Sequence, residues 1–262
     1  MLKAIYSVFN FRLIIILIET IIVLKLYKMF SIKIDIDLAI LSIAIVFPLV
    51  FSITSAYQRR QDSIAHYTGF RNKIINLTNL IYSVDTIKKE EYNALFKKLL
   101  ELQDDLNNLL LKPRKEGESN GKYRNKRKEI FGQIISLKQK FNEREKDSII
   151  RVKNELFYDI EMLNGIRLHG TPVSLRIYCL IFIFISPFLF SSHEIFISEN
   201  FSSDIFSIII SLTISFILMA LYNVQEYIEN PFDQKGLDDL KISSLQVEEN
   251  ECLDFLIQQR LV

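Results

Sequence analysis

Three large apolar residues stand at four-residue steps in the second apolar segment of the chain: Ile43, Phe47 and Phe51. In a helix, residues four positions apart lie on one slowly drifting face. If several copies of such a helix surround an axis, that face forms stacked apolar rings, and a constriction of this kind can gate ion passage by dewetting. Ordinary helix packing or lipid contact gives the same spacing, and periodicity alone favours this simpler interpretation.

A turn and a set of acids follow the last apolar segment: Asn230, Pro231, Phe232, Asp233, Asp238 and Asp239. Asn before Pro is typical of a chain leaving a helix through a turn. Carboxylates are ligands for hard cations such as Ca²⁺, so a cation or regulatory site is one interpretation. The spacing alone does not decide between such a site and a plain turn.

The sequence contains no pattern that supplies the groups of an enzyme. A Gly-rich phosphate loop, a zinc-ligand spacing and a G-x-S-x-G run are all absent. The histidines His66, His169 and His193 are scattered, and we interpret each as structural. We therefore expect no enzyme activity, no catalytic residue, no resident metal ion and no cofactor. The net charge of +1 gives no reason to expect a nucleic-acid partner.

Two polar features lie within apolar segments. Glu19 costs energy there unless it is paired or faces water. It could line a polar cavity, or it could pair with Arg12 or with a residue of another segment, and both interpretations stay open. A stripe of small hydroxyl residues, Ser207, Ser211 and Ser215, indicates close packing of the last apolar helix against a neighbour.

The elements that carry these residues are apolar blocks near both ends of the chain, and they enclose a highly charged middle. A helix needs about 20 residues to cross the hydrocarbon core of a bilayer. Four segments of about that length are candidate spans: 11–27, 38–56, 173–190 and 205–222. They form two closely spaced pairs. The sequence therefore predicts an all-α integral membrane protein with four transmembrane helices.

The flanking charges predict the orientation of these spans. The connection 191–204 carries acids and no Lys or Arg, whereas Arg59, Arg60 and Arg71 follow the second span. Because positive residues favour the cytoplasmic side, we expect the middle of the chain and both termini to be cytoplasmic. This places the protein in the cell membrane as a multi-pass protein.

The middle of the chain shows helical periodicity. Three helical stripes are expected, the first with Tyr67, Phe70, Ile74, Leu77 and Ile81, the second with Tyr92, Leu95, Phe96, Leu99, Leu102, Leu106 and Leu110, and the third with Phe131, Ile134, Ile135, Phe141, Ile149, Val152, Leu156, Ile160 and Leu163. The third is expected to be one helix. Each stripe must be buried against another helix, so we expect helices that extend the spans into a cytoplasmic bundle.

A charged segment with Pro and Gly, 112–122, predicts a mobile hairpin loop between the second and third stripes. Lys126, Arg127 and Lys128 extend a basic patch after it, which a solvated surface explains best. The predicted organisation is a first transmembrane hairpin over 1–56, a cytoplasmic helical domain over 57–172, a second hairpin over 173–222 and a cytoplasmic tail over 223–262.

Four residue patterns, in this order, resemble the bestrophins and their bacterial and plant relatives: Ser55-Ala56-Tyr57-Gln58-Arg59, Thr171-Pro172-Val173-Ser174-Leu175-Arg176, Phe184-Ile185-Ser186-Pro187, and Glu229-Asn230-Pro231-Phe232 with Asp238-Asp239-Leu240. Together with the span layout, they cover nearly the whole chain. The resemblance implies a homopentameric ion channel whose second span lines the pore, with membrane lipids and permeant ions as its other partners.

The resemblance also implies roles for particular residues. The apolar neck of the family has three residues at four-residue steps, the last of them eight before the arginine of a Tyr-x-Arg run. Counting back from Arg59 reaches Phe51, Phe47 and Ile43, so the family pattern selects the same residues as the periodicity. Tyr57, Arg59, Asn230, Pro231 and Phe232 are expected near the pore as gating or structural residues.

The sequence departs from the family pattern at the site where calcium-gated members bind Ca²⁺. Tyr227 stands where those members have a glutamine, and Lys235 interrupts the acids Asp233, Asp238 and Asp239. Calcium regulation is therefore doubtful. The second constriction of the family falls near 141–149 and is not assigned to a residue.

Two functions follow from these patterns. The first is a pentameric channel for small ions, with chloride or other anions as the expected ions. The alternative is a non-conducting membrane scaffold or sensor whose cytoplasmic helices bind a partner. The neck does not decide between anions and cations, and the sequence does not identify the gating stimulus or show whether the C-terminal tail is inhibitory.

Overall fold

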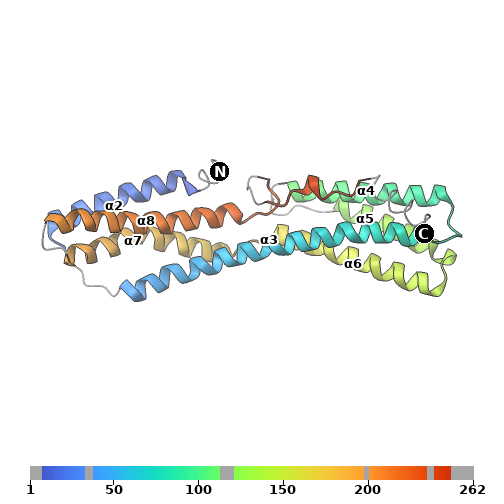
Figure 1. The fold of residues 1–262 in the computed structure, drawn as a ribbon, viewed down its shortest axis with the longest axis horizontal. Helices are drawn as coiled ribbons and strands as arrows, with labels where there is room; N and C mark the ends of the chain where they lie inside the picture. The colour runs from blue at the N-terminus through green and yellow to red at the C-terminus, as the bar shows by residue number, and fades with distance from the viewer. Residues whose placement is uncertain (1–7, 33–37, 113–120, 198–200, 235–238, 249–262) are drawn as a thin grey trace. The chain divides into compact units, whose positions relative to one another are not determined.

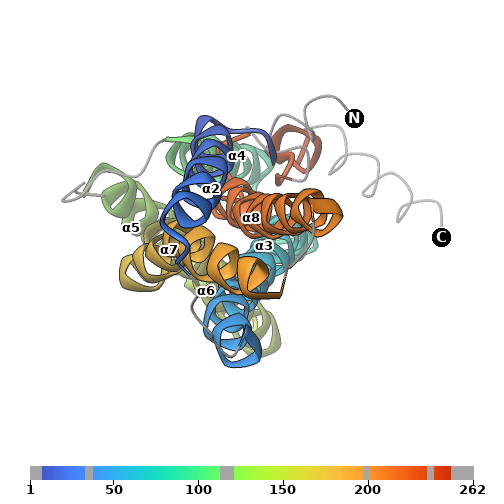
Figure 2. The same cartoon turned by 90° about the vertical axis from the view of Figure 1, so that its left-hand side faces the viewer.

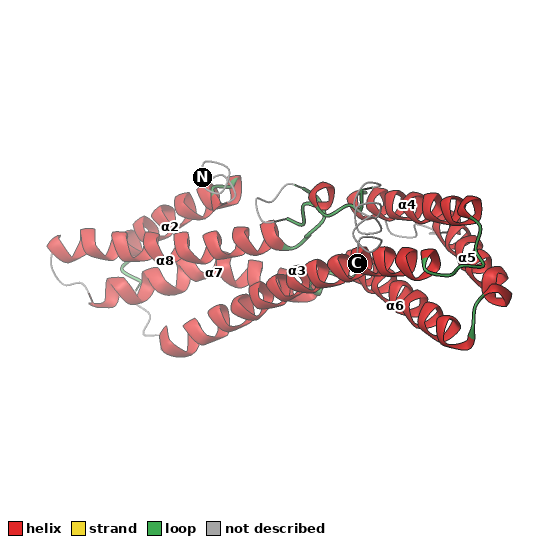
Figure 3. Ribbon diagram, turned by 45° about the vertical axis from the view of Figure 1, so that its right-hand side comes forward, coloured by secondary structure: helices red, strands yellow, loops and turns green. Residues whose placement is uncertain are grey.

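The computed structural model describes residues 8–32, 38–112, 121–197, 201–234 and 239–248, and all regular structure within these ranges is helical (Figure 3). The helices are α2 (Phe11–Phe30), α3 (Leu38–Tyr82), α4 (Lys89–Leu111), α5 (Gly121–Ser136), η1 (Leu137–Lys140), α6 (Glu143–Leu168), α7 (Val173–Ile197), α8 (Phe201–Ile228) and η2 (Ile242–Ser244) (Figure 1). The expectation of an all-α chain is confirmed for these residues.

The chain divides into two compact units. Unit 1 comprises 1–58, 170–230 and 235–238, and unit 2 comprises 59–169, 231–234 and 239–262. The first part of α3 belongs to unit 1 and its remainder to unit 2, so this 45-residue helix continues without a break from the predicted second span into the charged middle of the chain.

In unit 1, the helices α2, α7 and α8 pack pairwise against one another, which the end-on view makes visible (Figure 2). Leu13 and Ile16 of α2, Ile183 of α7 and Met219 of α8 are buried at their centre. Small hydroxyl residues of α8 pack there as well: Ser207, Ser211 and Ser215 are buried, and the Thr20 hydroxyl donates to Ser215 Oγ at 2.9 Å. The packing role expected for this serine stripe is confirmed.

The outer surface of unit 1 is strongly apolar. Exposed isoleucines and phenylalanines occur on each helix, among them Ile14, Ile18 and Ile22 on α2, Ile177, Ile181, Ile185 and Phe188 on α7, and Ile205, Phe206 and Ile209 on α8. Two helical stretches of the described residues contain a segment long and apolar enough to cross a membrane: Glu143–Ser191, which includes α6 and most of α7, and Ile205–Ile228 in α8. For α2 and α3 the predicted spans stay a prediction.

Unit 2 has the opposite arrangement, with apolar side chains inside. All members of the first two predicted stripes are buried, as are Ile149, Val152, Leu156, Ile160 and Leu163 of the third. The residues after α8 also contribute, because Phe232, Leu240, Ile242 and Val247 are buried in the same core. The Gln103 side chain of α4 exchanges two hydrogen bonds with the backbone of Val247, N to Oε1 at 2.9 Å and Nε2 to O at 3.3 Å.

The prediction of one helix for the third stripe is wrong. The chain forms α5, a short 3₁₀ turn and then α6. A new helix starts because Asn142 caps it: Asn142 Oδ1 accepts from the Glu145 N–H at 2.9 Å, and the Glu145 carboxylate accepts from the Asn142 N–H at 2.8 Å. This reciprocal pair is a capping box. Ile135 at the end of α5 is 56% exposed, so it does not continue the buried stripe.

The expected basic patch is also partly wrong. Arg127 is buried. Its guanidinium forms an ion pair with Glu161 and lies 4.0 Å from the centre of the Phe157 ring. Arg127 therefore joins α5 to α6. The predicted loop lies mostly outside the described residues, as does the C-terminal segment beyond residue 248.

Candidate functional site

The three predicted neck residues lie on one exposed face of α3. Ile43 is 65% exposed, Phe47 59% and Phe51 53%. On the opposite face of the same helix, Ile45 and Leu49 are buried in unit 1. The face of α3 that carries the three residues therefore points away from the core of unit 1.

Two of these residues touch each other. The Phe47 and Phe51 rings meet edge to face, with centroids 4.5 Å apart and planes at 89°. The hydrogens at the edge of one ring then face the π cloud of the other, which is a favoured aromatic geometry. The contact keeps the two rings together as one apolar surface.

The five residues predicted near the pore differ in burial and in the unit to which they belong. Tyr57 is 53% exposed on α3, and Arg59, the first residue of unit 2, is half-buried. Asn230 ends the second chain segment of unit 1 and is half-buried, whereas Pro231 and Phe232 are buried in unit 2. The role expected for these residues beside a pore stays a prediction.

The turn after α8 is closed by hydrogen bonds. The Leu240 N–H donates to the Pro231 carbonyl at 2.9 Å, and Gln234 Nε2 donates to the Leu240 carbonyl at 2.6 Å. Gln234 has a φ of 58°, in the left-handed region that non-glycine residues seldom adopt. Burial of Phe232 and these bonds indicate a structural function of the Asn-Pro-Phe run.

The structure describes two of the three acids of the possible cation site. Asp233 and Asp239 are half-buried in unit 2, and Asp238 lies outside the described residues. Among the described residues, His, Cys, Asp and Glu form no group of three or more that could hold a metal ion.

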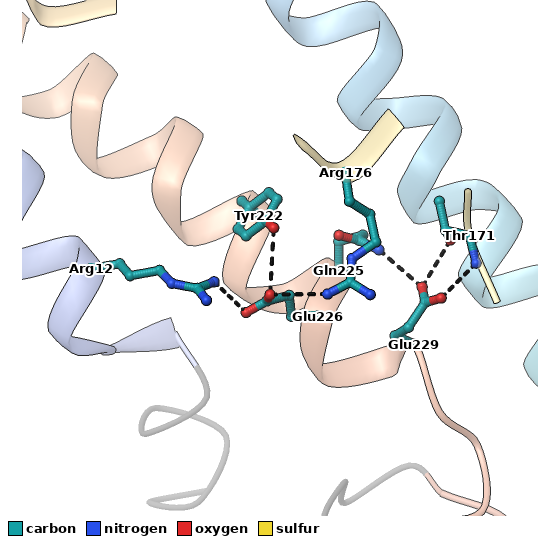
Figure 4. A network of polar contacts seen from close by, with 7 residues as sticks. All are labelled: Arg12, Thr171, Arg176, Tyr222, Gln225, Glu226 and Glu229. Atoms are coloured by element: carbon teal, nitrogen blue, oxygen red, sulfur yellow. Dashed lines mark hydrogen bonds and ion pairs between the residues drawn. The ribbon is translucent and has the colours of Figure 1, made fainter. Parts of the chain in front are cut away.

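A network of polar side chains connects the helices of unit 1 near one of their ends (Figure 4). At its centre Glu226 of α8 accepts from Arg12 Nη1 of α2 at 2.8 Å and from Arg176 Nη2 of α7 at 3.2 Å. The Tyr222 hydroxyl lies 3.4 Å from the same carboxylate. One carboxylate thus joins three helices.

Glu229, the residue that follows α8, bonds to Thr171, two residues before α7 begins (Figure 4). Its carboxylate accepts from the Thr171 N–H at 2.6 Å, from the Thr171 hydroxyl at 2.8 Å and from Gln225 Nε2 at 3.0 Å. Acidic groups are favourable at a helix N-terminus, where backbone N–H groups lack partners. Glu229 therefore fixes α7 where the Thr-Pro run enters it.

The network gives Arg12 a partner on α8. Arg12 bonds to Glu226, whereas Glu19 is half-buried on α2. Both interpretations of Glu19 stay predictions.

Sequence reasoning missed a charged cluster inside unit 2. Asp159 of α6 has only 4% of its side chain exposed, and its carboxylate bonds to Lys73 Nζ at 2.6 Å and to His66 Nδ1 at 2.9 Å. Both partners come from α3. A Cβ at Gly69, between them, would lie 2.6 Å from Asp159 Oδ2. Glycine at 69 therefore makes room for the carboxylate.

Signals for these missed residues are present in the sequence. Asp159 stands three residues after Leu156, in register with a buried stripe, and a carboxylate there requires a cation. Arg12 and Arg176 lie near the ends of two predicted spans that face the same side, so an acid on a neighbouring span would have been expected.

The second constriction of the family falls near 141–149, and it stays unassigned. Phe141 and Ile149, which bound this segment, are both buried in the core of unit 2.

Comparison with solved structures identifies the fold. A crystal structure of a bacterial bestrophin homolog from Klebsiella pneumoniae superposes with a TM-score of 0.71 at 15% identity, over 95% of this chain and 97% of that chain. A variant of that protein gives a TM-score of 0.73 at 15% identity over the same shares. A structure described as a membrane protein gives 0.71 at 16% identity, again over 95% and 97%.

No family model matches the sequence, and no curated protein matches it either. The likeness is therefore one of architecture, and it extends over nearly the whole length of both chains. It confirms, for the fold, the resemblance that four short residue patterns predicted. The chain has the fold of the bacterial bestrophin homologs.

Proposed function

We propose that this chain forms a membrane ion channel in which the exposed face of α3 is the apolar neck of the pore. One observation carries the proposal: Ile43, Phe47 and Phe51 are each more than half exposed, while the opposite face of α3 is buried. Large apolar side chains arranged along one face need a lipid, protein or pore environment. A ring of such faces around an axis would form a gate that opens by wetting.

The fold supports the channel over the scaffold. Nearly the whole chain superposes on bacterial bestrophin homologs, and the residues that the family pattern assigns to the neck are those on the exposed face. A homopentamer follows as the proposed assembly. Small anions, with chloride first, are the proposed permeant ions, and no catalytic activity is proposed.

The decisive experiment is ion flux from liposomes. Replacing Phe47 or Phe51 by Ala removes a ring from the neck and is expected to raise flux several-fold, because a wider and less apolar constriction wets more readily. Phe188→Ala is the matched control, since Phe188 is 40% exposed on α7 and lies off the neck face. Unchanged flux in both neck variants, with assembly intact, would contradict the neck assignment.

Two further measurements test the proposed number of subunits and the proposed ion selectivity. The mass of the solubilised complex should be about five times the 30.7 kDa of one chain; a monomer or dimer would favour the scaffold. Reversal potentials in asymmetric KCl report selectivity by their sign. A reversal potential of the sign expected for K⁺ would make the permeant ion a cation instead of an anion. The proposed channel function would then still stand.

The proposed topology is a multi-pass protein of the cell membrane with both termini cytoplasmic. The apolar outer surface of unit 1 supports its place in the bilayer. Single cysteines introduced within 191–204, where α7 ends and α8 begins, should react with an impermeant maleimide from outside intact cells. Reaction from the cytoplasmic side alone would reverse the proposed orientation.

A further inference from the structure

Two prolines lie inside helices of unit 1: Pro48 in α3 and Pro187 in α7. Proline has no backbone N–H, so the carbonyl four residues earlier loses its helical donor. The carbonyls concerned are those of Ala44 and Ile183. In an apolar environment an unpaired carbonyl is costly, and neighbouring side chains commonly supply the missing bond.

The structure satisfies the two carbonyls in different ways. For Pro187 the donor comes from the same helix, because the Ser186 hydroxyl donates to the Ile183 carbonyl at 2.7 Å. For Pro48 the donor comes from another helix: the Tyr178 hydroxyl of α7 donates to the Ala44 carbonyl at 3.3 Å. The first solution is local to α7, whereas the second ties α3 to α7.

The Tyr178 ring is itself held in place. It packs against the ring of Phe182, one turn further along α7, with centroids 4.4 Å apart. Side chains four apart on a helix are neighbours and restrict one another. The hydroxyl is therefore presented to α3 by a side chain with restricted freedom.

Pro48 divides the proposed neck. Ile43 and Phe47 precede it and Phe51 follows it, so the edge-to-face contact of the Phe47 and Phe51 rings spans the proline. Prolines are common sites of helix bending. A change of direction at Pro48 would move the first two neck residues relative to the third.

We propose that Tyr178 is a positioning residue for the neck: its hydroxyl replaces the backbone donor missing at Pro48 and thereby fixes the first part of α3 from α7. This role rests on the proposed channel function, but the bond itself does not. Tyr178 acts through the backbone of α3, and no contact of its own with an ion is required.

The test is a double-mutant cycle of Tyr178→Phe and Pro48→Ala. Tyr178→Phe removes the hydroxyl and keeps the ring, and should raise liposome flux by about threefold or more, the size expected of coupled residues. Pro48→Ala restores an N–H for the Ala44 carbonyl. In that background, Tyr178→Phe should leave flux unchanged. Equal effects of Tyr178→Phe in both backgrounds would overturn the proposal.

Ser186→Ala is the matched control, because it removes a hydroxyl from the other carbonyl freed by a proline. It should leave flux at the wild-type value. An effect as large as that of Tyr178→Phe would show that any lost bond in unit 1 disturbs conduction, and would overturn the specific role of Tyr178.

Amide hydrogen exchange in peptides covering 43–52 gives a readout that needs no conduction. Tyr178→Phe should accelerate exchange there in the wild-type background and not with Pro48→Ala; equal rates in all variants would overturn the inference. If the wild type carries no ions, the channel proposal fails and exchange still decides on Tyr178. If Phe47→Ala alters flux but Tyr178→Phe alters neither flux nor exchange, only the Tyr178 role fails.

Discussion

The two units of this chain bury opposite kinds of side chain. In unit 1, isoleucines and phenylalanines cover the outside, and hydroxyls such as those of Thr20 and Ser215 bond to each other inside. In unit 2, the large apolar side chains are inside and most charged residues lie at the surface. This difference fits the environments proposed for the two units, hydrocarbon around unit 1 and water around unit 2.

The units also use carboxylates differently. Glu226 at the end of the unit 1 helices is one-quarter exposed and joins two arginines, whereas Asp159 in unit 2 is almost fully buried between Lys73 and His66. The first lies at the end of α8, and the second lies inside a packed helix pair. The charged groups of unit 1 that form the described interhelical bonds, Arg12, Arg176 and Glu226, thus lie near the ends of their helices.

The largest expected effect comes from placing a charge on the outer surface of unit 1. Ile185 of α7 is 41% exposed. Ile185→Lys should oppose membrane integration by about 3 kcal/mol, because a lysine at the centre of a span is strongly disfavoured. The amount of protein that resists carbonate extraction measures the loss. Ile135→Lys in unit 2, at a residue 56% exposed, should change little, within about 0.5 kcal/mol; similar losses in both variants would refute the contrast between the units.

A somewhat smaller effect is expected from Asp159→Asn in unit 2. The change leaves Lys73 beside a neutral partner in a buried site, and breaking a buried pair in this way costs about 3 kcal/mol at full burial. Because Lys73 is 21% exposed, the loss should fall below that figure. Denaturant unfolding of the purified protein would measure it. Asp147→Asn, at an exposed acid of the same helix, should be neutral, and an equal loss there would exclude a special role of Asp159.

Tyr67 should make unit 2 sensitive to alkaline pH. Burial raises the pKa of its hydroxyl to about 12, while in the unfolded chain it is about 10. The folded chain therefore keeps the proton where the unfolded chain loses it, and the free energy of unfolding falls as the pH rises from about 10 to about 12, by about 2 kcal/mol. Tyr67→Phe should remove this dependence. Tyr158→Phe, at a tyrosine 56% exposed, should retain it; a dependence unchanged in Tyr67→Phe would contradict the assignment.

The smallest effect is expected at the surface of unit 2. The Lys140 ammonium, bonded to both oxygens of Glu91 at 2.6 Å, lowers the pKa of that carboxyl below its ordinary value. Because the pKa is lowered on folding, the pair contributes stability above the ordinary value and loses it as the pH falls through the lowered one. Glu91→Gln should flatten the acid limb of a plot of melting temperature against pH. An acid limb as steep as in the wild type would exclude the pair as its source.

Much of this architecture is predictable from the sequence, because apolar periodicity reports burial directly. The helices α2, α3 and α7 begin at the first residues of their predicted spans, and the stripes of α4 and of the second part of α3 are buried in full. The break between α5 and α6 was missed because apolar residues continue across it, whereas the capping residues Asn142 and Glu145 that define the new helix are individually common.

The interhelical bonds were less predictable than the helices. Glu226, Asp159 and Tyr178 bond to residues on other helices, and one sequence carries no information on which helices are neighbours. The neck residues were found because their signal is local to one helix. Pro48 shows the limit most clearly: the sequence tells that the Ala44 carbonyl needs a donor, and only the fold tells that Tyr178 supplies it.

The bonds of α2 have a consequence for the order in which the protein is made. This helix carries Arg12, Glu19, Lys25 and Lys28, a high charge for a predicted membrane span. Its two polar side-chain bonds described above are to α8, at sequence separations of 195 and 214 residues. During translation, α2 therefore leaves the ribosome long before α8, which carries its bonding partners, has been synthesised. We expect α2 to be only weakly inserted in the bilayer during synthesis and to become stably inserted once α8 packs against it.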